Sequence, residues 1–463
     1  MAAFLDLCRF VASAGGTTDW TYSSTVSPYI SPAEAGAVNG RAYKLRAESA
    51  DLTQWEVSEG AYSSAGAGSF ARTTVLYNSS GTGTLQSGAG TKIGFTAAPQ
   101  VWVVASKRDL LSIEEANGFT ATQKAQARAN IDALKKNYII NGAMMVSQEN
   151  GTTAGTTTGY YPVDQFAYNF QNTSGVISVV QVASVTPGGS PNRLRATVTT
   201  ADASVGAADI VWIDQKIEGS RVADLRYGSG SGKAITIQFG VKAPAGTYCV
   251  IVLNSAQTRS YVAEYVISGG EANTDVVKSV TIPADTTGTW LTDIGIGLWV
   301  RWGLMCGSSF QQAAGSWAAT NVFGSSSQFN FMGTLSNVFE LFDVGLHEGA
   351  AAPSFLVPDY PAELELCQRY WEWGGQGWSG RTLSGTDAQG TIIYREKRTA
   401  PTITWNGSNQ TIVEIGAGNR TATNIGSVSG NVKAAFVQLV SSSMGTGSYV
   451  MSTSNLVKLN ARL

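Results

Sequence analysis

Apolar and polar residues alternate with a period of two along much of this chain of 463 residues. Between residues 294 and 304 every even position is isoleucine, leucine, valine or tryptophan, and residues 235–241 alternate in the same way. Because successive side chains of a β-strand point to opposite faces, this alternation predicts strands with one face in a core. Glycine-rich stretches such as residues 79–83 separate the runs and predict turns. The pattern therefore predicts a mainly β protein.

One segment departs from this pattern, because residues 108–136 have the spacing of helices. Thr120 and Gln123 are placed to form a capping box, in which each side chain satisfies the main-chain amide of the other. Alanine then recurs at every fourth position, at Ala121, Ala125, Ala129 and Ala133. A face of such small side chains lets two helices approach closely. Two alternatives fit it: a neck where three chains meet, or a helix that packs on its own chain.

The predicted elements divide the chain into four parts. Residues 1–104 are expected to form a first β domain and residues 105–137 a short helical neck or linker. Residues 138–358 contain eight or more candidate strands at turn spacings typical of a jelly-roll-like β-sandwich. Residues 359–463 are expected to open with a short helix and to continue as a C-terminal β tip domain. The expected fold class is thus several β domains joined by a helical neck.

Composition narrows the range of partners. Charged residues make up 14% of the chain, against about 25% in typical soluble domains, while glycine reaches 52 residues. The net charge is −2 and no cluster of lysine and arginine stands out, so we expect no nucleic-acid partner. Apolar runs of about 18 residues are absent from the sequence, which predicts no membrane insertion. The first residues lack the pattern of a secretory signal, so folding in a cytoplasm is expected.

Cysteine and histidine spacing argues against metal and nucleophile chemistry. The four cysteines (Cys8, Cys249, Cys306 and Cys367) are far apart and include no CxxC pair, so a zinc site is not expected. Buried thiols are the simple interpretation, and a bridge between chains is the alternative. The single histidine, His347, would have to serve any histidine-dependent catalytic dyad or triad, and we interpret it as structural. Neither a metal nor a cofactor is therefore expected.

Two glycine-rich stretches imitate nucleotide-binding loops without their context. Residues 227–233 read YGSGSGK, but Ala234 follows where a phosphate loop has serine or threonine, and a strand pattern follows instead of a helix. Residues 375–380 match GxGxxG formally, yet they open no predicted helix. Both stretches are interpreted as turns.

Paired carboxylates are the motif most relevant to an enzyme that cleaves glycans. Such a reaction uses two carboxyl groups about 5 to 10 Å apart. The sequence offers three candidate pairs: Asp209 with Asp214, Glu340 with Asp343, and Asp359 with Glu363. A chain with 33 acidic residues contains such pairs by chance, and Glu340 and Asp343 are expected on opposite faces of one strand. We therefore predict that the protein is not an enzyme.

Aromatic residues supply a different candidate site at the start of the last domain. Tyr370, Trp371, Trp373 and Trp378 cluster beside three glycines. Flat aromatic rings stack on the apolar faces of sugar rings, and neighbouring glycines keep such rings accessible. These four residues are the candidate glycan-binding site. The alternative is that they fill a junction between domains or between chains.

Several strings carry a resemblance to a known family. Residues 54–62 read QWEVSEGAY, residues 70–76 read FARTTVL, and residues 89–92 read AGTK. This order resembles the N-terminal virion-attaching domain of tailed-bacteriophage tail fibres, in which W-E-x-G-x-G-x-Y precedes L-A-R-T-T-V-L and A-G-T-K. Ser58 stands where that family often has glycine.

Three further strings are similar to segments of phage fibre proteins. Residues 119–131 read FTATQKAQARANI, residues 139–148 read IINGAMMVSQ, and residues 363–371 read ELELCQRYW. The first falls in the predicted neck, the second opens the predicted sandwich, and the third opens the predicted tip domain.

The resemblance implies a bacteriophage tail fibre or receptor-binding protein. Residues 1–104 would attach to tail or baseplate proteins, and the outer β domains would bind bacterial surface polysaccharide or lipopolysaccharide. Fibres of this type usually contain three copies, so the resemblance implies a homotrimer, assembled in the host cytoplasm and located in the virion. Two alternatives remain open: a glycan-degrading tailspike, which would be a hydrolase or lyase, and a purely structural virion decoration.

Overall fold

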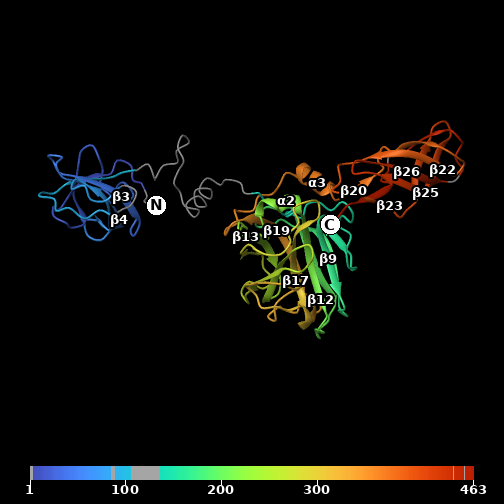
Figure 1. Cartoon of the computed structure of the whole chain (residues 1–463), viewed down its shortest axis with the longest axis horizontal. Helices are drawn as coiled ribbons and strands as arrows, with labels where there is room; N and C mark the ends of the chain where they lie inside the picture. The colour runs from blue at the N-terminus through green and yellow to red at the C-terminus, as the bar shows by residue number, and fades with distance from the viewer. Residues whose placement is uncertain (1–3, 85–88, 106–135, 442, 453) are drawn as a thin grey trace. The chain divides into compact units, whose positions relative to one another are not determined.

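The computed structural model describes residues 4–84, 89–105, 136–441, 443–452 and 454–463. Strands dominate these residues and helices are few and short, so the predicted mainly β class is confirmed (Figure 1). The chain divides into two compact units, Met1–Ala133 and Leu134–Leu463. The predicted helical neck, with its alanine face, lies outside the described residues except at its two ends.

Strands in the described part of the first unit form one sheet that closes on itself. Its order is β3-β7-β1-β2-β5-β4-β6, and an additional pairing of β3 with β4 completes the ring. Phe10, Trp20, Tyr43 and Phe70 are buried inside. The strands are β1 (Arg9–Ala12), β2 (Trp20–Thr25), β3 (Ala42–Glu48), β4 (Trp55–Ser63), β5 (Ser69–Phe70), β6 (Thr74–Asn78) and β7 (Gln100–Val103).

Two antiparallel sheets form a sandwich in the second unit. One has the order β10-β11-β19-β13-β16 and the other β18-β15-β14-β17-β12-β9-β8. Ile237 and Phe339 of the first sheet share a fully buried core with Val250 and Trp302 of the second. The first sheet comprises β10 (Val176–Ala183), β11 (Asn192–Thr200), β13 (Ile235–Lys242), β16 (Val276–Ile282) and β19 (Val338–Glu348). The second comprises β8 (Tyr160–Val163), β9 (Phe166–Gln171), β12 (Ile210–Glu218), β14 (Gly246–Leu253), β15 (Ser260–Ile267), β17 (Ile296–Cys306) and β18 (Trp317–Ala318).

Short helical turns connect some of these strands. They are α2 (Gly219–Val222), η2 (Ala223–Leu225), η3 (Ser308–Phe310) and η4 (Phe331–Gly333). A longer helix, α3 (Tyr360–Gln368), follows the sandwich and confirms the short helix predicted there. The carboxylate of Asp359 accepts a hydrogen bond from the Ala362 amide, and Pro361 lies in the first turn, which together set the start of the helix.

A small sheet and a closed barrel follow α3. The small sheet has the order β20-β28-β23, from β20 (Trp371–Gly374), β28 (Val457–Asn460) and β23 (Thr402–Trp405). The barrel has the order β21-β22-β26-β25-β24-β27. Its strands are β21 (Ser379–Thr382), β22 (Asp387–Ile393), β24 (Gln410–Glu414), β25 (Gly418–Gly430), β26 (Ala434–Ser441) and β27 (Tyr449–Met451). The chain passes from β20 into the barrel and finally returns from the barrel to β28. These two strands pair with each other, and Gly374 lies opposite Val457.

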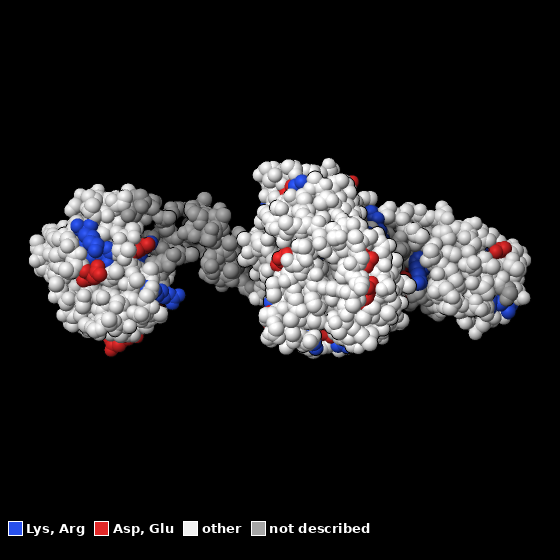
Figure 2. All heavy atoms as spheres, turned by 90° about the horizontal axis from the view of Figure 1, so that it is seen from below, with Lys and Arg blue, Asp and Glu red and all other residues white. Residues whose placement is uncertain are grey.

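Cysteine and histidine have structural positions. All four cysteines are buried free thiols. His347 is buried, and its Nδ1 lies 3.1 Å from the main-chain oxygen of Lys136. Among the described residues, no group of three or more histidine, cysteine or acidic side chains is arranged to hold a metal ion. No helix within the described ranges is long and apolar enough to span a membrane. On the face seen in Figure 2, charged residues are scattered in small groups and uncharged residues cover most of the surface.

Candidate functional site

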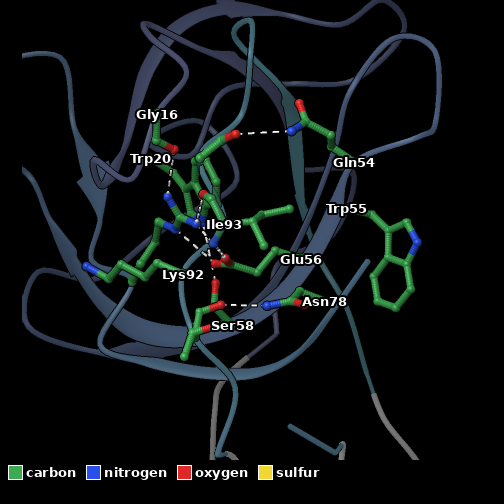
Figure 3. Close-up of polar contacts among 12 residues, drawn as sticks. Gly16, Trp20, Gln54, Trp55, Glu56, Ser58, Asn78, Lys92 and Ile93 are labelled. Atoms are coloured by element: carbon green, nitrogen blue, oxygen red, sulfur yellow. Dashed lines mark hydrogen bonds and ion pairs between the residues drawn. The ribbon is translucent and has the colours of Figure 1, made fainter. Parts of the chain in front are cut away.

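The strings that resemble phage fibres build a buried network around Glu56 and Arg72 in the first unit (Figure 3). Both side chains are completely buried. Arg72 Nε donates to Glu56 Oε1 at 2.9 Å, Arg72 Nη2 pairs with Glu56 Oε2, and the Ile93 amide donates to Oε2 at 3.1 Å. The Trp20 ring centroid lies 4.1 Å from the guanidinium carbon. This ion pair therefore joins β4 to two distant loops inside the core.

The rest of the same network holds those loops in place. Arg72 Nη1 donates to the main-chain oxygens of Gly16 and Thr18 at 3.1 and 3.2 Å. Asn78 Nδ2 donates to the Thr91 oxygen at 2.5 Å. Trp55 points away from this cluster (Figure 3). The motif residues therefore hold together the interior of this unit.

The four aromatic residues predicted as a glycan site have mostly interior positions. Tyr370, Trp371 and Trp378 are each 1% exposed, and Trp373 is half-buried. A ring can stack on a sugar only if one of its faces is open to solvent. The positions of the first three rings therefore favour packing, the alternative that the sequence left open.

Three of these residues connect the sandwich to the C-terminal part. The Tyr370 hydroxyl donates to Glu218 at 3.0 Å. Trp373 Nε1 donates to the Gln148 oxygen at 2.8 Å, and Gln148 Nε2 donates to the Trp371 oxygen at 2.9 Å. The junction thus combines the strings IINGAMMVSQ and ELELCQRYW, which lie far apart in the sequence.

Trp378 lies instead in the interior of the barrel, beneath a pair of glycines. Gly380 of β21 and Gly390 of β22 are directly opposite each other. A Cβ atom at Gly380 would lie 2.7 Å from Cη2 of the indole, and one at Gly390 would lie 2.8 Å from Cε2. Only glycine lets the two strands approach the ring this closely. The barrel wall is therefore thin above Trp378.

A groove of about 580 Å³ opens on the outside of this wall. Period-two alternation places the glycines inward, so their strand neighbours line the groove. These outward residues are Ser379, Arg381, Gln389, Thr391 and Ile393, joined by Gln376 and by Tyr449 of β27. Tyr449 is 66% exposed and Ile393 is 86% exposed. We call this site the barrel groove.

The barrel groove combines apolar walls with neutral hydrogen-bonding groups. Tyr449 and Ile393 offer flat or broad apolar surface, whereas Gln389, Ser379 and Thr391 offer amide and hydroxyl groups. Arg381 is the one charged side chain among the described residues that line it. Shallow sites that bind sugars need both kinds of surface, because a sugar ring has apolar faces and a polar rim.

Sequence comparison identifies no family for this chain. No protein-family model matches it, and no curated protein matches it either.

Structural comparison finds weak likeness to proteins that act on or bind carbohydrate. One is the enzymatically active domain of tailspike protein 4 of bacteriophage CBA120, with 10% identity and a TM-score of 0.26, covering 46% of this chain and 21% of that one. Another is the family 11 carbohydrate-binding module of Clostridium thermocellum in complex with a mixed-linked tetrasaccharide, with 13% identity and a TM-score of 0.22, covering 43% of this chain and 97% of the module. A third is the N-terminal part of xylanase 10B of the same organism with xylohexaose, with 11% identity and a TM-score of 0.22, covering 42% of this chain and 28% of that one. Likeness of this degree carries no argument about function, which has to come from the residues of the chain.

One of the candidate carboxylate pairs is occupied by structural contacts. Glu340 accepts hydrogen bonds from Arg193 Nη1 at 3.0 Å and from Arg195 Nε at 2.6 Å. Asp343 accepts from the Gly188 amide at 2.8 Å and from two hydroxyl groups. Both carboxylates are buried, so neither faces an open cleft.

The remaining pairs also have structural partners. Asp209 accepts from the Gly206 amide at 2.6 Å, and Asp359 caps α3. Asp214 accepts from a tryptophan indole at 2.7 Å, and burial raises its pKa. Burial also raises the pKa of Glu363, although a hydrogen bond from a main-chain amide opposes this effect. None of these carboxyl groups lines the barrel groove.

Of the described residues that line the barrel groove, the sequence singled out Trp378, and it missed the others. The sequence predicted strands over residues 391–394 and 449–452, but it did not place their side chains on a face. A usable signal was present in β21 and β22, where Gly380 and Gly390 alternate with the polar residues Ser379, Arg381 and Thr391. In such strands the glycine positions leave one face of the sheet without a side chain, and the polar residues line the opposite face.

Proposed function

We propose that this chain is a bacteriophage tail-fibre protein that binds a bacterial surface glycan at the barrel groove. In this proposal residues 1–104 attach the protein to tail or baseplate proteins of the virion. The observation that carries the glycan part is the exposed Tyr449 beside a groove of neutral hydrogen-bonding side chains. Support for the attachment part is the ordered set of strings in residues 54–92.

The proposed mechanism is binding without catalysis. A sugar ring would stack on Tyr449 while its hydroxyl groups bond to Gln389 and Thr391. Glycoside hydrolysis typically uses two opposed carboxyl groups, and the described residues that line the groove include none. Each contact is shallow, so useful affinity would come from several copies of the groove on one virion.

Substituting Tyr449 tests the groove directly. Tyr449→Ala is expected to weaken binding of the purified protein to host cells by roughly 30-fold, because an exposed aromatic anchor contributes about 2 kcal/mol. Tyr360→Ala is the matched control, since Tyr360 is 50% exposed but lies at the start of α3. Cell-binding isotherms measured by fluorescence give both values. Equal binding by the Tyr449 and Tyr360 variants would contradict the groove as the receptor site.

We also propose that the protein assembles as a homotrimer through the outer face of the barrel. Val413 and Ile415, on and just after β24, are exposed beside the exposed Met451 of β27. Phe436 of β26 and Val428 of β25 are also exposed. Apolar surface of this kind on a barrel that has no free strand edge is a suitable contact between copies.

The double variant Val413→Asp, Ile415→Asp is expected to dissociate such an assembly. Two carboxylates forced into an apolar contact cost several kcal/mol, so the dissociation constant should rise by more than about 100-fold. Light scattering after size-exclusion chromatography measures the mass. Val277→Asp, an exposed strand valine of the sandwich, should leave the mass unchanged. A wild-type protein that elutes as a monomer would refute the trimer.

A further inference from the structure

Three side chains of the barrel groove form one row across neighbouring strands. Arg381 of β21 is directly opposite Tyr449 of β27 on one side and Gln389 of β22 on the other. Side chains directly opposite each other in antiparallel strands point to the same face, with Cβ atoms about 4.5–5.5 Å apart. An aromatic ring, a guanidinium and an amide therefore lie side by side along the groove.

The guanidinium of Arg381 is held in place but is not neutralised. Its Nε donates to the main-chain oxygen of Gly447 at 3.2 Å. No ion pair involves Arg381 in the described part of the chain, and Nη1 and Nη2 have no hydrogen-bond acceptor there. The backbone at Gly447 has a φ of +83°, which favours glycine, and the Cα of this residue lies close to Nη2 of Arg381.

A nearby arginine shows the usual arrangement in this barrel. Arg420 of β25 donates to Glu414 of β24 at 2.7 Å, so its charge is already balanced within the protein. Arg381 has no such carboxylate, because the other groove residues are neutral. A fixed, unbalanced guanidinium beside hydrogen-bonding side chains is suited to an anionic group, which it can bind with two parallel hydrogen bonds.

We propose that the glycan bound in the barrel groove carries an anionic substituent and that Arg381 recognises it. This inference rests on the proposed glycan-binding function. The sugar ring lies against Tyr449, the anionic oxygens accept hydrogen bonds from Nη1 and Nη2 of Arg381, and a neighbouring hydroxyl group bonds to Gln389. The shared chemistry is a carboxylate or a phosphate attached to a sugar.

The test uses the full chain on an array of bacterial polysaccharides that are neutral, contain uronic acid, or carry phosphate. Wild-type protein is expected to prefer anionic polymers, and Arg381→Gln should bind them at least about tenfold more weakly, since a charge-assisted pair is lost. Arg381→Lys keeps the positive charge but lacks the planar guanidinium. Its affinity for anionic polymers should therefore lie between those of the wild type and Arg381→Gln. Arg395→Gln is the control, because Arg395 is 60% exposed, pairs with Glu365 and lies outside the groove.

Chemical treatment of the bound polymer distinguishes the two anions. Reduction of its carboxyl groups abolishes the Arg381-dependent binding if the ligand group is a carboxylate, and removal of phosphate abolishes it if the group is a phosphate. Binding to neutral polymers only, or anionic binding that Arg381→Gln leaves unchanged, overturns the inference while the proposed function stands. Failure to bind any polysaccharide or host cells overturns both.

Discussion

Replacing Arg72 with leucine will unfold the first unit under conditions in which the wild-type protein stays folded. The substitution leaves the carboxylate of Glu56 buried without its partner, and it removes three further hydrogen bonds to main-chain oxygens. Removing one member of a buried ion pair costs about 3–5 kcal/mol. For a unit of this size, such a loss lowers the melting temperature by more than about 10 °C.

Hydrogen–deuterium exchange on the intact protein measures this effect locally. Peptides from β4 and β6 should lose protection, while peptides from the sandwich keep it, because Glu56 and Arg72 both belong to the first unit. Lys92→Gln is the matched control: Lys92 and Asp19 form a half-exposed pair at 3.8 Å, so its loss should cost less than about 1 kcal/mol. The double change Glu56→Gln, Arg72→Leu should be less destabilising than the two single effects added together. A loss of unfolding free energy for Arg72→Leu similar to that for Lys92→Gln would show that the buried ion pair does not explain the motif residues.

Replacing Glu218 with alanine is expected to loosen the C-terminal part from the sandwich. The carboxylate of Glu218 is 1% exposed and accepts from Arg369 Nε at 2.9 Å, from Arg369 Nη2 at 2.8 Å and from the Tyr370 hydroxyl at 3.0 Å. Its removal leaves the Tyr370 hydroxyl buried without an acceptor. The expected loss of unfolding free energy is about 3 kcal/mol. This is the low end of the range for a buried ion pair, because one third of the Arg369 side chain is exposed.

The same contact should make the stability of the second unit depend on pH. Burial alone raises the pKa of Glu218, but the hydrogen bonds from Arg369, Ser220 and Tyr370 outweigh it and hold the pKa below the ordinary value of 4.5. A carboxyl group with a lowered pKa in the folded state stabilises the fold above pH 4.5, and this contribution is lost as the pH falls further. Denaturant unfolding at pH 7 and at acidic pH should therefore show a smaller acid-induced loss for Glu218→Ala than for wild type. Glu365→Gln, at a pair exposed on both sides, should behave as wild type at both pH values.

The sequence was sufficient to predict the strands and α3 because these depend on local patterns. Alternating apolar residues in 235–241 fall in β13, and those in 294–304 fall in β17 and the turn before it. Both strands are buried on nearly both faces, however, and not on one as predicted. The short helix was predicted near residue 363, and in the structure it begins slightly earlier, where Asp359 and Pro361 set its start. Local signals of this kind act over a few residues, so no knowledge of the fold was needed to find them.

The candidate site could not be predicted because its formation depends on strand register. Trp378 lies in the sequence beside Gly374, Gly375 and Gly377, which suggested an accessible ring. The pairing of Gly380 with Gly390 instead lets the indole pack inside the barrel, and that pairing is fixed only when the sheet forms. Tyr449 joins the groove from a strand about 70 residues away along the chain, in register with Arg381. No window of sequence contains both residues.

The adjacency of β20 and β28 has a consequence for the exchange of parts between related proteins. The segment that forms the barrel and β23 is inserted between these two paired strands, so it begins and ends at neighbouring positions. Any other domain whose two ends lie equally close together could occupy the same place without disturbing the junction at Glu218. Recombination at these two strands would thus replace the barrel together with β23 as one unit and preserve the rest of the chain.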